Sequence, residues 1–299
     1  MRKGIILAGG AGTRLWPLTA YTCKQLLPVY DKPLIYYPLT SLILAGIQDI
    51  LIISTPEDTP VLQKALGDGA FYGVSIQYAV QENPNGLAEA LIIGEEFLGG
   101  EDCCLILGDN ILYRSGFTHF MKAAIAENSG ATVFGFPVKD PSRFGVIETA
   151  DDAQKVLSLE EKPEKPKSNL AAIGLYLYDG SASEKARSLK PGKRGELEIT
   201  DLNLLYLHED RLNHCRFSRG DFWLDAGLFE TLNDASNLVR LTEDYTGQKI
   251  GCPEEAAFVM GNIDRDTVLE RAEMMPQSAY SAYLRRIARP KGTMFGTEE

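Results

Sequence analysis

Apolar and polar positions alternate in a regular rhythm along the first half of the chain. Short continuous apolar runs, typical of strands buried on both faces, are separated by longer stretches whose apolar residues recur at helical spacing. Strands that alternate with helices in this way predict an α/β fold with a Rossmann-like, doubly wound and mostly parallel sheet. The predicted strands cover 4–8, 50–54, 74–80, 103–107 and 131–138, and the predicted helices cover about 34–45, 60–66, 87–97 and 117–127.

The pattern changes after about residue 138. Apolar runs there are separated by charged turns rich in proline and lysine, which predicts an additional mixed or antiparallel region followed by a C-terminal helical segment. Strands are predicted at 144–149, 156–160 and 172–178, a helix at 196–208, a short strand or turn at 222–227 and helices within 254–289. We expect a single domain over 1–290, with regions at about 1–138, 139–229 and 230–290, and a tail at 291–299.

Composition and charge limit the partners and the compartment. The 299 residues are 44% hydrophobic and contain no apolar run of membrane-spanning length and no signal-peptide pattern, which predicts a cytoplasmic protein without a membrane partner. The net charge of −11 argues against nucleic acid as a partner. Five cysteines without C-x-x-C spacing and three scattered histidines leave carboxylates as the ligands of any metal ion.

A glycine-rich segment, GGAGTR at 9–14, follows the first predicted strand. The G-x-G-x-x-G pattern of dinucleotide-binding folds fails at Leu15, and a Walker-type loop would end in Gly-Lys-Ser/Thr instead of Gly-Thr-Arg. The remaining hypothesis is a loop whose amides hold a polyphosphate while Arg14 supplies further donors. A tight turn with a surface arginine stays open as the alternative.

An acidic residue, Asp109, follows the predicted strand at 103–107. The carboxyl ends of parallel strands meet at one edge of the sheet, so this carboxylate is expected close to the glycine-rich segment. A carboxylate beside a polyphosphate is a suitable Mg²⁺ ligand. Asp109 could equally be a helix N-cap or a turn former.

Six short motifs occur in an order that resembles the sugar nucleotidyltransferase family, and within it the glucose-1-phosphate thymidylyltransferases. Longer runs such as KQLLPVYDKPLIYYPL and RGELEITDLN are similar as well, and the resemblance covers essentially the whole chain. The motifs are GGAGTR at 9–14, KQLLP at 24–28, Gln81, LGDN at 107–110, EEKP at 160–163 and WLD at 223–225.

The resemblance implies a reaction in which glucose 1-phosphate and dTTP give dTDP-glucose and pyrophosphate. The expected mechanism is a single Mg²⁺-assisted in-line displacement, supplying precursors for deoxysugar and polysaccharide synthesis. Residues 1–138 would then bind the nucleotide and residues 139–229 the sugar phosphate. Two alternatives stay open: an enzyme that prefers UTP, and a non-catalytic regulatory relative that keeps only the fold.

The resemblance also implies roles for individual residues. Arg14, Lys24 and Lys162 would be catalytic, and Asp109 and Asp225 would hold Mg²⁺. The nucleotide-binding residues would be Gly9, Gly10, Gly12, Thr13, Arg14, Lys24, Gln25, Gln81, Gly86 and Asp109. The sugar-phosphate-binding residues would be Asn110, Gly145, Glu161, Lys162, Ala172, Arg194, Glu196 and Trp223.

Each of these residues also has an ordinary interpretation. The two glutamines could be solvated surface residues, Lys162 a lysine in a charged turn, and Arg194 an exposed arginine at the start of a helix.

The chain departs from the family pattern near the expected sugar site. Phe144 stands where a tyrosine is usual, Ala172-Ile173 replaces a typical Val-Thr, and Asp225 is followed by AGLF instead of Thr-Gly-Thr-His. The differences at Phe144, Ala226, Leu228 and Phe229 leave the sugar preference open.

Two further properties are implied by the resemblance. Family members are typically homotetramers, and they are inhibited at a second site by a downstream dTDP-deoxysugar. The segment KIGCPEE at 249–255 and Arg219 resemble residues near that second site.

Overall fold

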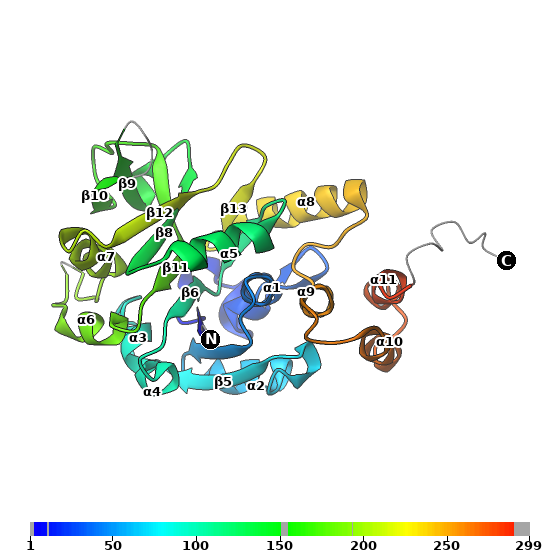
Figure 1. Ribbon diagram of the computed structural model, residues 1–299. Coiled ribbons are helices and arrows are strands. Elements are labelled where there is room, and N and C mark those ends of the chain that lie inside the picture. Colours follow the sequence, from blue (N-terminus) through cyan, green and yellow to red (C-terminus); the bar gives the residue numbers. More distant parts are fainter. Residues whose placement is uncertain (1–2, 11, 151–154, 193, 290–299) are drawn as a thin grey trace.

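A computed structural model describes residues 3–10, 12–150, 155–192 and 194–289 of the chain, and the tail predicted at 291–299 lies outside them. A central sheet is flanked by helices, which confirms the predicted α/β class with a mostly parallel sheet (Figure 1). The strands are β1 (Lys3–Leu7), β2 (Pro28–Val29), β3 (Lys32–Pro33), β4 (Asp49–Ser54), β5 (Ser75–Val80), β6 (Cys103–Leu107), β7 (Asn110–Tyr113), β8 (Ala131–Pro137), β9 (Gly145–Thr149), β10 (Val156–Glu161), β11 (Leu170–Tyr178), β12 (Leu212–Arg216) and β13 (Phe222–Asp225).

The centre of the sheet consists of four parallel strands in the order β6-β1-β4-β5. β11 pairs antiparallel with β6 and connects this centre to β8, β9, β10 and β12. The strand order therefore reverses between β1 and β6, which is where open α/β sheets bind ligands beyond the carboxyl ends of their strands. The Gly108 amide donates to the Leu7 carbonyl at 2.8 Å, so the segments after these two strands begin side by side.

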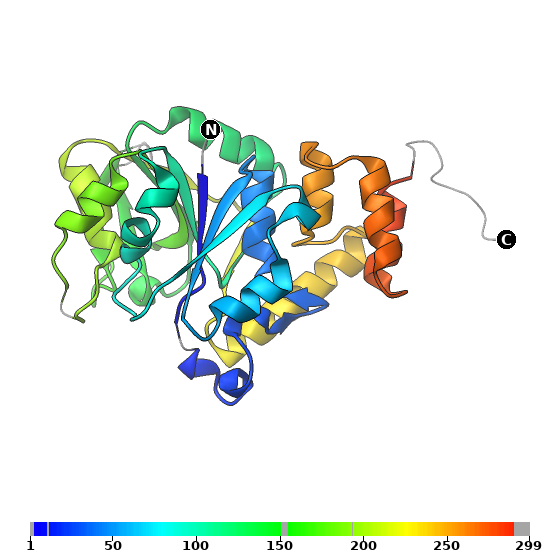
Figure 2. The ribbon, with the colours of Figure 1, turned by 90° about the horizontal axis from the view of Figure 1, so that it is seen from below.

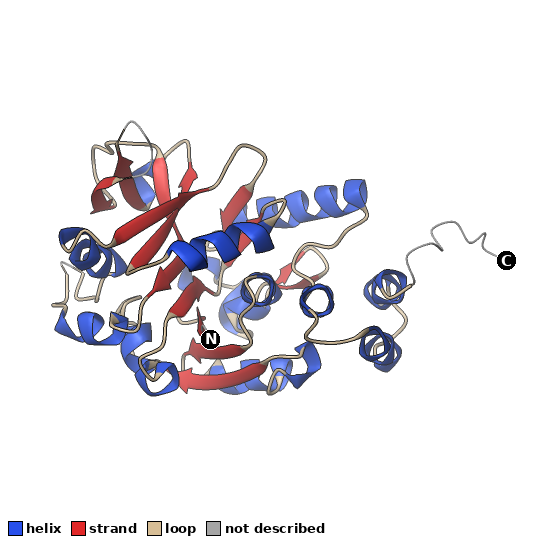
Figure 3. Ribbon diagram, in the orientation of Figure 1, coloured by secondary structure: helices blue, strands red, loops and turns tan. Residues whose placement is uncertain are grey.

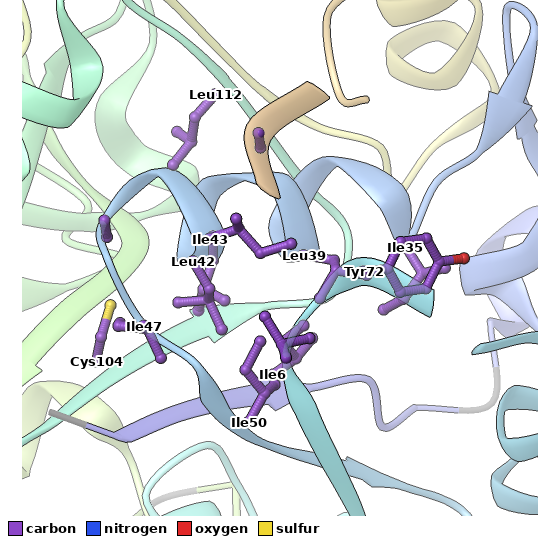
Figure 4. Packing of buried hydrophobic residues seen from close by; sticks show 14 of the residues in the cluster. Ile6, Ile35, Leu39, Leu42, Ile43, Ile47, Ile50, Tyr72, Cys104 and Leu112 are labelled. Carbon is purple, nitrogen blue, oxygen red and sulfur yellow. The ribbon is translucent and has the colours of Figure 1, made fainter. Parts of the chain in front are cut away.

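Both faces of the parallel strands are buried. Ile6 packs in one cluster with Leu39 and Leu42 of the first helix (Figure 4). Ile5 and Leu7 belong to a second cluster on the opposite face. Successive side chains of a strand point to opposite faces, so burial of both faces requires a continuous apolar run. This requirement explains why the central strands are visible in the sequence.

The helices cover both faces of the sheet (Figure 2). Figure 3 shows α10 and α11 together at the C-terminal end, on the far side of α9 from the sheet. None of the helices in the described ranges is long and apolar enough to cross a membrane. Their bounds are α1 (Tyr36–Leu44), α2 (Thr59–Leu66), α3 (Glu89–Ile93), α4 (Glu95–Leu98), α5 (Phe117–Glu127), α6 (Ala182–Ser188), α7 (Ile199–His208), α8 (Phe229–Thr246), α9 (Pro253–Met260), α10 (Arg265–Met274) and α11 (Ala279–Ile287).

Several elements differ from the prediction. The helix predicted at 87–97 is divided at Gly94 into α3 and α4, and a Cβ on Gly94 would lie 2.9 Å from Ile5 Cδ1, so the chain passes unusually close to the sheet there. The helix predicted from residue 196 begins only at Ile199. β7, β12 and α6 were not predicted. Among the described strands β12 pairs only with β8, and its sequence, LNHCR, has no continuous apolar run.

Candidate active site

A cavity of about 170 Å³ opens where β1 and β6 end. A Cβ on Gly9 would lie 2.7 Å from Gln81 Oε1, so the glycine allows the glutamine amide to lie against the loop backbone. Apolar walls with a few amide groups suit a flat polar heterocycle. We refer to this space as the β1 cavity; it is lined by Leu7, Gly9, Gly10, Gln25, Gln81, Pro84, Gly86, Leu87, Leu107, Asp109 and Glu196.

Gly86 closes one side of the β1 cavity for a reason that the sequence did not reveal. Its φ is +114°, and a Cβ there would lie 2.4 Å from the carbonyl oxygen and 2.5 Å from the amide nitrogen of Leu197. The Leu197 amide donates to the Asn85 carbonyl at 2.6 Å, and the Ala88 amide donates to the Leu197 carbonyl at 3.1 Å. Gly86 thus permits two backbone segments to pair directly beside the cavity.

Asp109 carries a buried cationic partner. Lys24 is only 8% exposed, and its Nζ forms an ion pair with Asp109 Oδ2. Burial alone would raise the pKa of Asp109, but the Lys24 ammonium outweighs that effect and lowers the pKa below its usual range. The Asp109 carboxylate is therefore held ionised beside the β1 cavity.

Asp225 lies next to Asp109 because β13 pairs antiparallel with β7. In this ladder Asp225 is opposite Asn110, and the Ala226 amide donates to the Asp109 carbonyl at 3.0 Å. Burial first, and then the nearby Asp109 carboxylate, raise the pKa of Asp225 to about 6. Asp225 Oδ1 is buried and has no hydrogen-bond partner within the described residues.

These two carboxylates have the chemistry of a partial cation site. A buried, unpartnered carboxylate oxygen beside a second carboxylate fits a hard divalent cation, which prefers oxygen ligands. Among the described residues no group of three or more His, Cys, Asp or Glu side chains is arranged to hold a metal ion. Asp109 and Asp225 therefore fit a cation that takes its remaining ligands from bound phosphates or water.

A second cavity, of about 320 Å³, adjoins the β1 cavity and shares Asp109 and Glu196 with it. We refer to it as the β11 cavity. It is lined by Arg14, Leu87, Leu107, Asp109, Asn110, Arg143, Phe144, Gly145, Glu161, Lys162, Ala172, Gly174, Tyr176, Arg194, Glu196, Glu198, Ile199, Trp223 and Asp225.

Lys162 occupies an unusual backbone conformation at the edge of the β11 cavity. Its φ is +44°, which is uncommon for a residue with a side chain, and its amide donates to the Phe144 carbonyl at 3.0 Å. Its Nζ lies 3.3 Å from Glu161 Oε1. The other oxygen of Glu161 accepts a hydrogen bond from Thr200 Oγ1 at 2.6 Å.

Arg194 lies among three carboxylates. Its Nη2 is 2.8 Å from Glu198 Oε2, 3.4 Å from Glu196 Oε2 and 3.8 Å from Glu161 Oε1. The hydrogen bond to Glu198 raises the pKa of Arg194 further above its usual value. The guanidinium is thus fixed at the cavity by its acidic neighbours.

Asn110 is buried and connects three strands. Its Oδ1 accepts from Trp223 Nε1 at 2.6 Å and from the Gly174 amide at 3.1 Å, and its Nδ2 donates to Asp109 Oδ1 at 2.8 Å. The Phe144 ring packs edge-on against Trp223, with ring centroids 5.0 Å apart. Both bonds to Oδ1 and one bond from Nδ2 are thus made within the protein, and one hydrogen of Nδ2 remains.

Most of the residues that the sequence singled out lie around these two cavities. The side chains of Arg14 and Asp225 both lie against Gly227. A Cβ on Gly227 would lie 3.1 Å from Arg14 Nη2 and 2.8 Å from Asp225 Oδ1. Lys24 reaches the site through Asp109, and Gly12 lies against Lys24. Thr13 is exposed and lines neither cavity.

The sequence did not single out Arg143, Thr200 or Glu89. Arg143 lines the β11 cavity, and its charge offsets a small part of the rise that burial and Asp109 cause in the pKa of Asp225. Thr200 donates a hydrogen bond to Glu161. Glu89 accepts a hydrogen bond from Gln81 at 2.7 Å. Thr200 lies in the family-like run RGELEITDLN and Glu89 in the family-like run GLAEALIIGEEFLG, which were the available signals.

The site lies where the strand order reverses, and it combines two carboxylates with nearby cations. This arrangement suits a protein that transfers phosphate groups, and comparison with known proteins identifies the family. The family described as nucleotidyl transferase matches residues 3–241, and the chain belongs to this family. The resemblance seen in the sequence is thereby confirmed. Members of the family generally use a divalent metal ion.

Curated relatives cover almost the whole chain. Glucose-1-phosphate thymidylyltransferase of Xanthomonas campestris pv. campestris (strain B100) is 52% identical over 288 residues, which are 96% of this chain and 97% of that one. The enzyme of the same name from Neisseria gonorrhoeae is 53% identical over 282 residues, covering 94% and 98%. That of Mycobacterium tuberculosis (strain CDC 1551 / Oshkosh) is 49% identical over 282 residues, covering 94% and 97%.

Solved structures share the fold. A putative glucose-1-phosphate thymidylyltransferase from Bacillus anthracis, in complex with a sucrose, matches with a TM-score of 0.75 and 41% identity, covering 80% of this chain and 96% of that one. A UDP-glucose pyrophosphorylase complexed with UDP-glucose matches with a TM-score of 0.72 and 27% identity, covering 81% and 99%.

Proposed function

We propose that this protein forms dTDP-glucose and pyrophosphate from dTTP and glucose 1-phosphate. The observation that carries the proposal is the pair of adjoining cavities that meet at Asp109, with Asp225 beside it. One cavity suits a base and the other is rimmed by cations and hydrogen-bonding groups that suit a sugar phosphate. The names of the relatives at about half identity support the same substrates.

In this proposal the nucleotide occupies the β1 cavity. Gln25 and Gln81 face the base, and the glycines at 9, 10 and 12 let the backbone follow the triphosphate. Arg14 and Lys24 neutralise the charge that develops on the departing pyrophosphate. Thr13 is exposed, so its hydroxyl contributes only if the phosphates extend out over the loop.

The sugar phosphate occupies the β11 cavity in this proposal. Lys162 contacts the phosphate, aided by Arg194, and Glu161, Glu196 and the Gly145 backbone receive sugar hydroxyls. Ala172 and Trp223 form walls of the cavity. Asn110 fixes Asp109 and Trp223, and the second hydrogen of its Nδ2 remains for a sugar oxygen.

Asp109 and Asp225 are the residues that would hold Mg²⁺. When bound, the ion neutralises phosphate charge and helps to orient the reacting groups. Lys24 keeps Asp109 ionised, and the ladder between β7 and β13 keeps Asp225 facing it.

No general base is needed in this reaction. A phosphate monoester is already an anionic nucleophile near neutral pH. The protein therefore contributes by positioning the sugar phosphate opposite the α-phosphorus and by neutralising charge on both sides of it. Among the described residues four cations line the β11 cavity, and Lys24 pairs with Asp109 where the two cavities meet.

A second candidate is the corresponding reaction with UTP. The structural match to a UDP-glucose pyrophosphorylase favours it, because thymine and uracil differ by one methyl group. An apolar pocket distinguishes one methyl group by only about 10–200-fold. Some activity with UTP is therefore expected even if dTTP is preferred.

A pyrophosphate-release assay with each nucleoside triphosphate against a panel of sugar 1-phosphates tests the proposal. The highest kcat/KM is expected for dTTP with glucose 1-phosphate. A higher value for another pair would replace the substrate assignment, and no release with any pair would support a non-catalytic regulatory protein.

The proposal includes a homotetramer and inhibition by a dTDP-deoxysugar at a second site. A cavity of about 210 Å³ supports the second site, since Lys249 and Glu255 line it together with Arg114. Arg114 also forms an ion pair with Asp221 and donates to Ser218 at 3.2 Å, which links the cavity to the loop carrying Arg219. Light scattering tests the homotetramer, and inhibition kinetics with a dTDP-deoxysugar test the second site.

A further inference from the structure

The amide group of Gln81 has a defined orientation. Gln81 is only 7% exposed, and its Nε2 donates two hydrogen bonds, to the Gly86 carbonyl at 3.2 Å and to Glu89 Oε2 at 2.7 Å. An amide nitrogen has two hydrogens, so both are used. The group that remains for a ligand is Oε1, which lies over Gly9 at the β1 cavity.

Glu89 enforces this orientation because an ionised carboxylate can only accept hydrogen bonds. If the Gln81 amide turned over, its oxygen would face both the Glu89 carboxylate and the Gly86 carbonyl, leaving acceptors opposite one another. Glu89 is itself held in place, since its Oε1 accepts from Asn85 Nδ2 at 2.8 Å. Gln81 therefore presents an acceptor, and no donor, to the cavity.

Gln25 presents the opposite group to the same cavity. Its Oε1 accepts from Cys23 Sγ at 3.0 Å, and Asp58 is a second acceptor for the same thiol proton. Burial raises the pKa of the Cys23 thiol to about 12, so the thiol keeps its proton. Within the described residues Gln25 Nε2 has no hydrogen-bond partner, which leaves this donor for a ligand.

We propose that Glu89 is a positioning residue that selects the nucleobase by fixing the oxygen of Gln81 toward it. A fixed acceptor pairs with the ring N3–H of thymine or uracil, and the Gln25 donor suits a neighbouring ring carbonyl. Cytosine presents an acceptor at N3, so it would oppose the Gln81 oxygen. The inference rests on the proposed function for the presence of a base in the β1 cavity, and it deepens that function by naming what excludes cytosine.

Binding of dTTP and dCTP to the whole chain, measured by titration calorimetry without sugar phosphate, tests the role of Glu89. The unchanged protein is expected to bind dTTP at least about a hundredfold more tightly than dCTP, since a site built to pair with one group strongly rejects its opposite. In Glu89→Gln only the longer bond to the Gly86 carbonyl, at 3.2 Å, still requires the donor of Gln81 on that side, so the preference for this orientation weakens and the ratio should fall by about tenfold or more. Glu89→Lys offers only donors at that position and should shift the ratio further toward dCTP.

Glu96→Gln is the matched control, because it makes the same charge change at an exposed position of α4. The control should keep the ratio of the unchanged protein. Equal weakening of both nucleotides in Glu89→Gln, or a ratio that stays within twofold of the control, would overturn the inference and reduce Glu89 to a structural residue. Preference of the unchanged protein for dCTP would overturn it as well.

The same variants separate this inference from the proposed function. The ratio of binding constants does not require transfer to occur, whereas the proposed function fails if the unchanged protein releases no pyrophosphate with dTTP and glucose 1-phosphate. In an active enzyme the ratio of kcat/KM for dTTP and dCTP should fall in Glu89→Gln to the same extent as the binding ratio.

Discussion

Lys162 is held in place by its backbone more than by its side chain. The positive φ and the hydrogen bond from its amide to Phe144 fix where the side chain starts, while the ammonium group remains half exposed at the β11 cavity. A left-handed conformation costs free energy for any residue with a Cβ, and such positions cluster at functional sites. This geometry leaves the ammonium group available to bind a phosphate.

Lys162→Ala should raise the KM for glucose 1-phosphate far more than the KM for dTTP. Alanine keeps the Cβ, so the backbone strain is unchanged and only the cation is lost. A hydrogen bond to a charged group contributes about 1.5–3 kcal/mol, which corresponds to roughly 10–150-fold in KM. Initial rates with each substrate varied in turn measure the effect.

Lys165→Ala is the control, since Lys165 is an exposed lysine of the same turn. It should change neither KM. A rise in the KM for dTTP with an unchanged KM for glucose 1-phosphate would contradict the role proposed for Lys162.

Asp225→Asn should lower activity by roughly two to four powers of ten while leaving the fold intact, because the amide keeps the shape of the carboxylate and removes a proposed metal ligand. The double variant with Asp109→Asn should be barely worse than either single variant, since both residues act on one ion. Raised Mg²⁺ or Mn²⁺ should restore part of the activity of the single variants. Circular dichroism checks the fold, and an Asp225→Asn variant with near-normal activity and Mg²⁺ dependence would make Asp225 a turn residue only.

At the scale of secondary-structure elements, strand pairing brings Asp109 and Asp225 together. Asp109 precedes β7 and Asp225 ends β13, and these two strands form a separate two-stranded sheet beside the carboxyl ends of the parallel strands. The segment at 85–88 pairs with Leu197 in a similar way and forms the wall between the two cavities. Short backbone pairings between distant segments thus shape the site.

Gly86→Ala should damage this wall. The new Cβ would lie 2.4 Å from the Leu197 carbonyl oxygen, so the two backbones must separate. We expect a loss of stability of about 1–3 kcal/mol from the backbone conformation alone, and a higher KM for both substrates because the segment borders both cavities. Urea unfolding and steady-state kinetics measure the two effects.

Gly261→Ala separates the two causes, because Gly261 has a φ of +76° and a Cβ at that position would point into open space. It should lose stability without a change in either KM. Unchanged KM values in Gly86→Ala would show that the contact with Leu197 does not shape the site.

The sequence predicted those elements and residues whose signals are local. Strands β1, β4 and β6 were visible because burial on both faces demands continuous apolar runs, and the order of short motifs indicated the site. The pairing of β7 with β13, the reason for a glycine at position 86 and the effect of Glu89 on Gln81 depend on contacts between segments. Sequence spacing carries no trace of such contacts, so only the structure shows them.

At the scale of the whole molecule, a cluster of four charges joins segments more than two hundred residues apart; Lys32 and Glu243 are buried, and the side chains of Asp31 and Lys249 are partly exposed. Lys32 Nζ lies 2.8 Å from Glu243 Oε1 and 2.5 Å from Asp31 Oδ1, and Lys249 Nζ lies 2.9 Å from Glu243 Oε2 and pairs with Asp31. The ion pairs of this cluster connect α8 and the segment before α9 to the β2–β3 turn. That turn follows directly on the segment carrying Lys24 and Gln25, so the cluster stabilises the region that supports the site.

Asp31→Asn should destabilise the protein at neutral pH and much less in acid. Burial opposes ionisation of Asp31, but hydrogen bonds from Lys249 and Lys32 outweigh it and lower the pKa. A folded-state pKa below the unfolded value gives stability that is present above the unfolded pKa and is lost as the pH falls through the folded one. We expect a loss of about 1.5–3 kcal/mol at pH 7 that shrinks below about pH 4, measured by urea unfolding across this range.

Asp244→Asn is the control for this cluster. Asp244 pairs with Arg240 one helical turn away on the exposed side of α8, at 3.1 Å, and such pairs contribute only about 0.3–0.5 kcal/mol. An equal effect of the two substitutions, or a loss in Asp31→Asn that does not depend on pH, would show that the cluster does not stabilise the fold as described.

The most direct test of the proposed reaction follows the oxygen atoms of the sugar phosphate. Glucose 1-phosphate labelled with ¹⁸O in its terminal phosphate oxygens is incubated with dTTP, Mg²⁺ and the protein, and both products are analysed by mass spectrometry. If a sugar-phosphate oxygen forms the new bond to the α-phosphorus of dTTP, dTDP-glucose should retain all of the label and pyrophosphate should carry none. Label in pyrophosphate, or the absence of a labelled nucleotide sugar, would contradict transfer at the site formed by Asp109, Asp225 and the two cavities.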